Sequence, residues 1–296
     1  MSVTCALLTV LLLVSVEQEV LADEAFKPPP DAKVNADVVY ATVGDTQLHM
    51  DIVLPKEPKS KRPCVVWIHG GGWREGSYKA NRAAWMAGHG YVVASIQYRF
   101  SQEAIFPAQI HDCKAAIRFL RKNAFRYGID PSRIGAWGLS AGGHLSALLA
   151  TSGGVKELEG SEGDAECSSR IQAVCDFYGP ADFSYMPQTI GNKPSPVTAL
   201  LGGSARTKRE LARLASPITH ITKDDPPVLI AHGDQDTLVN IRQSERFLDA
   251  LTKAGVEAKL IVVKGAGHGF PESGAEPTRE EIDKQVLAFF DRHLKR

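Results

Sequence analysis

Short apolar runs alternate with segments of helical period along most of the 296-residue chain. In one such segment Ile110, Cys113, Ile117 and Leu120 fall on a single helix face. This alternation is typical of parallel strands joined by crossover helices, and it predicts an α/β fold with helices on both faces of the sheet. The expected parallel strands are residues 64–68, 91–97, 134–137, 171–177, 227–231 and 258–263.

Further elements at the two ends of the domain complete this sheet. Residues 38–43 and 48–54 are strand-like and are joined by Gly44 and Asp45, which predicts an antiparallel hairpin at a sheet edge. We therefore expect a mostly parallel sheet of about eight strands. Apolar residues at helical spacing over 286–294 predict a C-terminal helix.

The chain is expected to form one catalytic domain, residues 37–296, after a proline-rich leader over 23–36. Residues 179–226 interrupt the regular alternation, because they are rich in proline and show little sustained period. This stretch follows a strand, so we expect an insertion near the active site, above the carboxyl edge of the sheet.

The first 22 residues have the pattern of a signal peptide. An apolar run over 6–16 is followed by Val20-Leu21-Ala22, a small-residue cleavage pattern before an acidic pair. No Lys or Arg precedes the run, so an N-terminal membrane anchor is the alternative. The run is shorter than the roughly 20 residues that span a bilayer, which favours cleavage. We expect a secreted or periplasmic protein with no membrane span after cleavage.

Charge and cysteine content exclude several classes of protein. Lys+Arg and Asp+Glu both number 34, so the net charge indicates no nucleic-acid partner. The cysteines show no CxxC pair and no zinc spacing, so no metal site is expected. Cys64 and Cys113 lie in apolar patterns and are expected to be buried. Cys167 and Cys175 bracket a short loop, and a disulfide between them is expected to be possible after export.

A G-x-S-x-G sequence over residues 138–142 is the sharpest chemical signal. It follows a predicted strand and precedes a helical pattern, which is the context of a nucleophile elbow. The elbow needs a serine on a strained turn, with glycines where a Cβ would collide with neighbouring backbone. Ser140 is therefore the predicted nucleophile.

Three consecutive glycines follow His69 and precede Trp73, directly after the predicted strand 64–68. Acyl transfer needs backbone N–H groups aimed at the developing oxyanion, and glycines allow that close approach. We expect the donors to be Gly71 and Gly72, joined by Ala141. A glycine-rich turn or a phosphate loop is the alternative, but the GxxxxGK[ST] and GxGxxG patterns are both missing.

A serine nucleophile needs a histidine base and an acid that orients it. Chain order in this type of fold is nucleophile, acid, base, and only His268 and His293 follow the strand at 227–231. His268 lies in a glycine-rich loop after a strand, whereas His293 lies in a charged terminal helix and is expected to be solvated. Asp236 is preferred to Asp234 as the acid, because it lies further beyond the strand end.

These residues resemble the α/β-hydrolase superfamily, within it the hormone-sensitive-lipase-like esterases and the group of bifunctional acetylxylan and feruloyl esterases. The resemblance implies that Ser140, Asp236 and His268 are catalytic, and that no metal or organic cofactor is needed. It rests on HGGGW from His69, YR from Tyr98, FPA from Phe106 with Asp112 beyond it, GLSAGG from Gly138, HGDQD from His232 and GAGHGF from Gly265. Only the leader precedes residue 37, where hormone-sensitive-lipase-like esterases carry a helical cap, and this favours the second group.

We therefore expect a serine carboxylesterase that cleaves short-chain acyl, acetyl or feruloyl esters of small molecules or polysaccharides. Trp73 and Phe270, which adjoin the catalytic loops, are expected to line the substrate pocket. An amide hydrolase, such as an arylformamidase or a dipeptidyl-peptidase-like enzyme, is the alternative, since the same triad attacks either carbonyl. A non-catalytic binding protein is a remote alternative, because such a chain normally lacks the serine or the histidine. The pattern does not indicate an oligomeric state.

Overall fold

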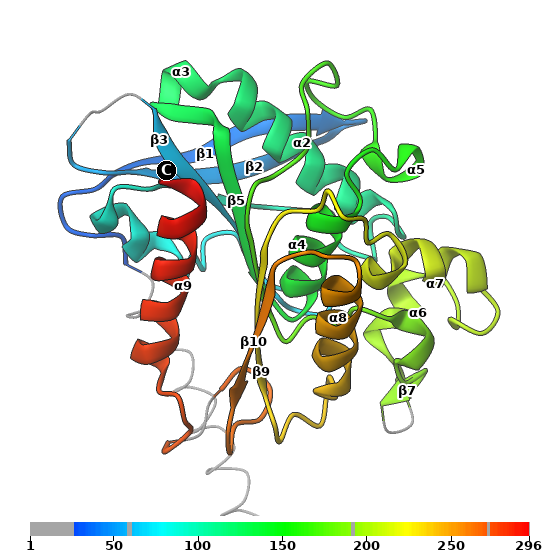
Figure 1. Ribbon diagram of the computed structural model, residues 1–296. Coiled ribbons are helices and arrows are strands. Elements are labelled where there is room, and N and C mark those ends of the chain that lie inside the picture. Colours follow the sequence, from blue (N-terminus) through cyan, green and yellow to red (C-terminus); the bar gives the residue numbers. More distant parts are fainter. Residues whose placement is uncertain (1–26, 58–60, 191–192, 271–272, 296) are drawn as a thin grey trace, which may run out of the picture.

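The computed structural model describes residues 27–57, 61–190, 193–270 and 273–295. A central eight-stranded sheet carries helices on both faces (Figure 1), and the predicted α/β fold with a mostly parallel sheet is confirmed. The predicted signal peptide lies outside the described residues. The strands are β1 (Lys33–Val43), β2 (Thr46–Leu54), β3 (Arg62–Ile68), β4 (Val92–Ile96), β5 (Ile129–Leu139), β6 (Val174–Phe177), β9 (Val228–Gly233) and β10 (Ala258–Val263).

The strand order in this sheet is β1-β2-β4-β3-β5-β6-β9-β10. Only β2 runs antiparallel to its neighbours, and all pairs from β4 to β10 are parallel. The carboxyl ends of β5, β9 and β10 therefore meet at one edge of the sheet. Side chains from the loops after these strands can converge there, as ligand-binding groups do in open α/β sheets.

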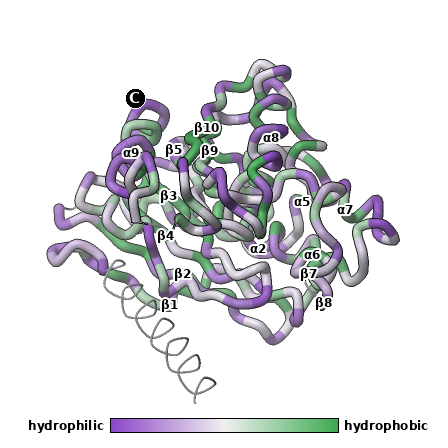
Figure 2. Tube along the Cα trace, turned by 90° about the horizontal axis from the view of Figure 1, so that it is seen from below, coloured by the Kyte–Doolittle hydropathy of each residue, from purple (hydrophilic) through white to green (hydrophobic). Residues whose placement is uncertain are grey.

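Alternate residues of each central strand point to opposite faces of the sheet, and helices cover both faces. In β3, Cys64, Val66 and Ile68 face a core completed by α2, α4 and α8, while Val65 and Trp67 face η1 and α9. Figure 2 shows hydrophilic and hydrophobic positions mixed along α8 and α9. These helices are η1 (Ala84–His89), α2 (Ala108–Lys122), α4 (Ala141–Thr151), α8 (Arg242–Lys253) and α9 (Arg279–Leu294). None of the helices in the described part of the chain is both long and apolar enough to cross a bilayer.

The start of the sheet lies earlier than predicted. β1 begins at Lys33, so the predicted domain boundary at residue 37 falls inside this strand. Lys33 and Val34 pair with Leu54 and Val53 of β2. The first residues of β1 are mostly exposed, because the strand lies at the sheet edge, and their polar character conceals them in the sequence.

Residues between β6 and β9 fold into short elements, in the stretch where an insertion was predicted. A small hairpin and several helical turns make up this stretch (Figure 1), and the last of the turns packs against α4 and α8. They are η2 (Phe183–Tyr185), β7 (Thr189–Ile190), β8 (Lys193–Pro194), α6 (Pro196–Leu200), α7 (Arg209–Ala215) and η3 (Pro217–Thr219). The remaining helices, α3 (Ala124–Tyr127) and α5 (Lys156–Glu159), flank α2.

The disulfide between Cys167 and Cys175 that the sequence left open is not formed in this structure, where both are free thiols. Cys175 lies in β6 and its side chain is buried in the core that contains Trp137 and Phe177. Cys167 lies in a loop and is only half-buried. The strand therefore directs one thiol into the core, where the loop cysteine does not pair with it. Cys64 and Cys113 are buried, as predicted.

Candidate active site

Ser140 occupies a strained turn between β5 and α4. Its backbone has φ 52° and ψ −115°, which non-glycine residues rarely adopt. Two backbone bonds hold this turn: the Ser140 N–H donates to Phe177 O (2.8 Å), and the His144 N–H donates to Ser140 O (2.9 Å). A Cβ at Gly142 would lie 2.0 Å from Ile68 O, so only glycine lets α4 approach β3 this closely.

Ser140, His268 and Asp236 lie in one hydrogen-bonded line. The Ser140 hydroxyl donates to His268 Nε2 over 2.9 Å, and His268 Nδ1–H donates to Asp236 Oδ2 over 2.7 Å. The residues come from the ends of β5, β9 and β10, which the sheet topology brings to one edge. The Asp236 side chain is fully buried, whereas 23% of the His268 side chain is exposed. The geometry is that of a nucleophile, a base and an orienting acid.

Four polar groups contact the Asp236 carboxylate. Oδ1 accepts from the backbone N–H groups of Leu238 and Val239, each over 2.9 Å. Oδ2 lies 2.7 Å from His268 Nδ1 and 3.3 Å from His232 Nε2. Burial alone would raise the pKa of Asp236, but the bonds from His232, His268 and Val239 hold it below the ordinary 3.8. The acid is therefore ionised at every pH at which a histidine base can work.

His232, to which the sequence analysis assigned no role, lies beside the Asp236 carboxylate. The fully buried imidazole has Nε2 2.8 Å from Val239 O and Nδ1 2.7 Å from Ser244 Oγ. The carbonyl can only accept, so Nε2 carries the proton and Nδ1 accepts from the Ser244 hydroxyl. The same Nε2–H faces Asp236. Spacing does carry a signal here, because His232 and Asp236 share the HGDQD sequence.

Asp234 does not contact the candidate base. Its Oδ1 accepts a hydrogen bond from the Gly265 N–H over 2.8 Å. Gly265 begins the loop that carries His268, so Asp234 joins the two loops that follow β9 and β10. The predicted preference for Asp236 as the partner of His268 therefore agrees with the geometry. His293 is not solvated as expected: only 8% of its side chain is exposed, and it packs against Phe289 on α9.

The three expected oxyanion donors lie around Ser140. Gly71 and Gly72 line the same hollow as Ser140, and Ala141 is the first residue of α4. No oxygen in the described part of the chain accepts a hydrogen bond from these three backbone N–H groups. Gly71 has φ 104°, and a Cβ there would lie 2.1 Å from Glu75 O, so this turn requires glycine. Free donors beside a serine hydroxyl are what an oxyanion needs.

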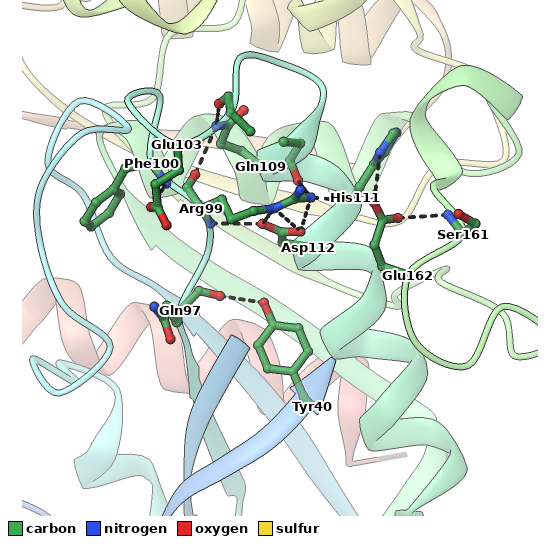
Figure 3. A network of polar contacts seen from close by, with 12 residues as sticks. Tyr40, Gln97, Arg99, Phe100, Glu103, Gln109, His111, Asp112, Ser161 and Glu162 are labelled. Carbon is green, nitrogen blue, oxygen red and sulfur yellow. Dashed lines mark hydrogen bonds and ion pairs between the residues drawn. The ribbon is translucent and has the colours of Figure 1, made fainter. Parts of the chain in front are cut away.

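A second loop fixes the glycine loop in place. The Tyr98 hydroxyl lies 3.1 Å from His69 O and 3.3 Å from Gly70 O, and it donates to these carbonyls. The next residue, Arg99, forms a two-pronged ion pair with Asp112 on α2, with its NH2 2.6 Å from Oδ1 and its Nε 2.9 Å from Oδ2 (Figure 3). Asp112 is fully buried and also accepts from the Arg99 N–H. The ion pair thus anchors the loop that holds the oxyanion donors.

Tyr178 lines the hollow at Ser140 and packs against the candidate base. It has φ 45° and its ring meets that of His268 edge to face, with centroids 4.7 Å apart. Burial raises the pKa of Tyr178 to about 12, so its phenol stays protonated. A strained backbone held against the candidate base indicates that the ring limits how far His268 can rotate.

A hollow of about 490 Å³, here called the catalytic hollow, opens onto Ser140 and His268. Trp73 lines it, as expected, although only 3% of this residue is exposed, and its indole N–H donates to His144 Nδ1 over 3.2 Å. Phe270 is not among the described residues that line the hollow. Its ring packs against Tyr178 instead, with centroids 5.0 Å apart, so the expectation for Phe270 was wrong. The loop turns the side chain behind the site, where it supports Tyr178.

His144 and His69 are neutral structural histidines. His144 Nδ1 accepts from Trp73 and its Nε2–H donates to Ala215 O over 2.7 Å, which defines one neutral tautomer. Burial lowers the pKa of each from 6.5 to about 4. Neither can therefore compete with His268 for the proton of Ser140.

The strand order, the elbow after β5 and the hydrogen-bonded serine, histidine and aspartate define an α/β-hydrolase. The BD-FAE family model matches residues 50–251, and the chain belongs to that family.

Solved structures similar to this chain agree with this assignment. A truncated carbohydrate esterase from gut microbiota is 35% identical, with a TM-score of 0.79 over 91% of this chain and 99% of that one. The propionate-bound esterase 2 of Thermogutta terrifontis is 30% identical, with a TM-score of 0.70 over 88% and 92% of the two chains.

Curated relatives include two proteins of Mycobacterium tuberculosis. The probable carboxylic ester hydrolase LipM is 34% identical over 64% of this chain and 44% of its own length. The esterase LipC is 30% identical over 72% of this chain and 54% of its own length. The chain thus spans about half the length of these relatives.

Removing the His232 donor is expected to weaken catalysis without unfolding the site. In His232→Phe, Asp236 Oδ2 loses one partner, so kcat should fall by about 10- to 100-fold, the equivalent of one hydrogen bond to a charged group. His232→Gln retains an amide N–H and should lose less. Steady-state ester hydrolysis assays measure kcat for each variant, and thermal melts show whether each variant is folded. A wild-type kcat in folded His232→Phe would contradict the prediction.

Acid is expected to destabilise the fold through the two buried histidines. The folded-state pKa values near 4 lie below the ordinary 6.5, so the unfolded chain binds more protons between these two values. The free energy of unfolding should therefore fall as the pH drops from 6.5 towards 4, by about 1.4 kcal/mol per pH unit for each histidine. Urea titrations at a series of pH values give the free energy of unfolding as a function of pH. For His144→Gln the slope of this free energy against pH should be smaller by that amount. Equal slopes for the two proteins would show that His144 is protonated when folded.

Proposed function

We propose that this chain is a serine carboxylesterase that cleaves short-chain acyl, acetyl or feruloyl esters through an acyl-enzyme on Ser140. The observation that carries the proposal is the hydrogen-bonded line of Ser140, His268 and Asp236 at the catalytic hollow. Family membership and the esterases among its relatives support the same reaction type.

Acylation begins when Ser140 Oγ attacks the ester carbonyl while His268 Nε2 takes its proton. Asp236 keeps the Nδ1 proton on the imidazole and stabilises the imidazolium that forms. The negative charge that develops on the carbonyl oxygen is directed to the free N–H groups of Gly71, Gly72 and Ala141. His268 then protonates the departing alcohol, and the acyl group remains on Ser140.

Deacylation repeats these steps with water as the nucleophile. His268 takes a proton from the water as its oxygen attacks the acyl-enzyme carbonyl, and the same donors stabilise the second oxyanion. Collapse of this intermediate returns the proton to Ser140 Oγ and releases the carboxylic acid. Tyr178 and Asp236 hold the imidazole on two sides, so one His268 orientation serves both halves of the reaction.

The lining of the catalytic hollow supports small or apolar acyl groups. Its walls are largely aliphatic, and the segment between β6 and β9 supplies much of them. A volume of about 490 Å³ is in the range of pockets that hold drug-sized ligands, which accommodates an acetyl or a feruloyl group. Apolar side chains from that segment that face the hollow are Pro180, Met186, Pro187, Ile190, Pro196 and Val197.

Substrate profiling with a nucleophile variant tests this proposal. The described domain should release 4-nitrophenol from the acetate and butyrate esters and ferulate from methyl ferulate. Ser140→Ala should lose at least about 10³-fold in kcat, because the nucleophile itself is removed. Initial rates measured by absorbance decide this. Ser146→Ala, which removes a second hydroxyl from α4, is the matched control and should retain activity.

Two results would contradict the esterase. Activity on N-formylkynurenine alone would make the chain an amide hydrolase that uses the same residues. No turnover of any ester, by a protein that melts cooperatively, would leave a binding function.

The apolar run over residues 6–16 supports a location outside the cytoplasm, secreted or periplasmic. Expression of the full chain in a bacterium should yield a mature protein that begins at Asp23, as measured by mass spectrometry of the exported fraction. An uncleaved chain in the membrane fraction would instead favour the anchor.

A further inference from the structure

A second hollow of about 500 Å³ adjoins the catalytic hollow. Both are lined by Met186 and Pro187, so this two-residue wall separates them. The second hollow, here called the arginine hollow, is formed by residues 184–188 and by Ala205, Arg206 and Arg209. Because the two hollows share this wall, a group bound in the second lies beside the catalytic hollow.

The arginine hollow carries positive charge that no protein group balances. Arg206 and Arg209 are both exposed, and within the described residues no carboxylate lies at ion-pair distance from either guanidinium. The Arg209 guanidinium donates one hydrogen bond, from Nε to the Arg206 carbonyl oxygen over 3.2 Å. Guanidinium groups stay protonated at all physiological pH values. The hollow therefore holds two unneutralised cations.

The acids nearest in sequence already have other partners. Asp182 binds Arg246, with the Arg246 NH2 2.9 Å from Oδ2, and it also accepts from the Ser184 N–H. Glu210 lies 3.5 Å from Arg213 on α7. These acids are therefore paired away from Arg206 and Arg209, so both guanidinium groups remain available to an anionic ligand.

The backbone beneath the two arginines is held firmly. Gln188 Oε1 accepts from the Ala205 N–H over 2.7 Å, and Gln188 Nε2 donates to Met186 O over 2.9 Å. One side chain thus ties the arginine turn to the wall between the hollows. A fixed distance between the cations and Ser140 is what a specificity site requires, because a group bound there then places the ester at the nucleophile.

Tyr185 gives the hollow an aromatic wall. This residue is 65% exposed, and the Arg246 guanidinium lies over its ring at 3.8 Å. An exposed ring beside free guanidinium groups suits a ligand that is a ring with a carboxylate, because the ring packs on the aromatic edge and the carboxylate accepts two parallel N–H bonds.

We propose that the arginine hollow binds a carboxylate of the substrate, so that esters on acid-bearing molecules, such as oligosaccharides with uronic-acid residues, are preferred. The inference rests on the proposed esterase activity and adds the class of substrate. Arg206 and Arg209 are binding residues for the charged group and take no part in bond making.

A matched pair of substrates tests the preference. One is an acetylated oligosaccharide that contains uronic acid, and the other is the same material with its carboxyls converted to neutral N-methylamides. Acetate release should give a kcat/KM about fivefold or more higher for the acid form, mainly through KM, as expected for exposed charge-assisted bonds. The double variant Arg206→Ala/Arg209→Ala should lose this ratio and keep the wild-type rate on 4-nitrophenyl acetate.

The control removes two positive charges from the opposite edge of the sheet. Arg126→Ala/Lys253→Ala has the same net charge as the test variant, and its preference for the acid form should match the wild type. Added salt should shrink the wild-type ratio, since exposed charges are screened. Equal rates on the two substrates, or a preference that survives in Arg206→Ala/Arg209→Ala, would overturn the proposal.

A binding measurement separates this proposal from the esterase assignment. The deacetylated acid oligosaccharide should bind the wild type in calorimetry, and its Kd should rise about fivefold in the double variant. Binding without any turnover of 4-nitrophenyl acetate would refute the proposed function and keep the anionic site. Turnover of 4-nitrophenyl acetate without such binding would refute the anionic site alone.

Discussion

The close approach of α4 to β3 is the constraint on which the site depends. A Cβ at Gly142 would lie 2.0 Å from Ile68 O, so only glycine allows this approach beside Ser140, whose backbone conformation a free chain would avoid. The strain is offset by the surrounding bonds to Phe177 and His144. The same turn frees the N–H of Ala141 and directs the serine hydroxyl outward. Nucleophile and oxyanion donor are thus set by a single packing contact.

Buried polar groups with complete hydrogen bonding also fix the positions of the other loops around the site. Asp236 is bonded at both oxygens, and His232 and Ser244 in turn fix its position. On the other side Tyr98 holds the glycine loop, while Arg99 and Asp112 anchor Tyr98 to α2. Each network stabilises the fold only because it is fully paired, since an unpaired buried charge is costly. The networks therefore rigidify the loops on which the proposed chemistry depends.

The segment between β6 and β9 gives this fold its particular surface. It walls the apolar hollow at Ser140 and, on its other side, presents free guanidinium groups. A sheet that serves many reactions can thus acquire a preference for one kind of ester through a single inserted stretch.

The sequence by itself determined the fold class, the position of Ser140 in a nucleophile elbow and the pairing of Asp236 with His268. Hydrophobic periodicity and the order of motifs can be read directly along the chain. The sequence misplaced the start of β1, whose edge position makes its residues polar. It left open a bond between Cys167 and Cys175 that the structure does not contain, because Cys175 faces the core. Only the tertiary structure revealed His232 behind Asp236, Tyr178 against His268, and Phe270 turned behind the site. These roles depend on which loops meet at the edge of the sheet. The order of residues along the chain does not give the distances between those loops in space.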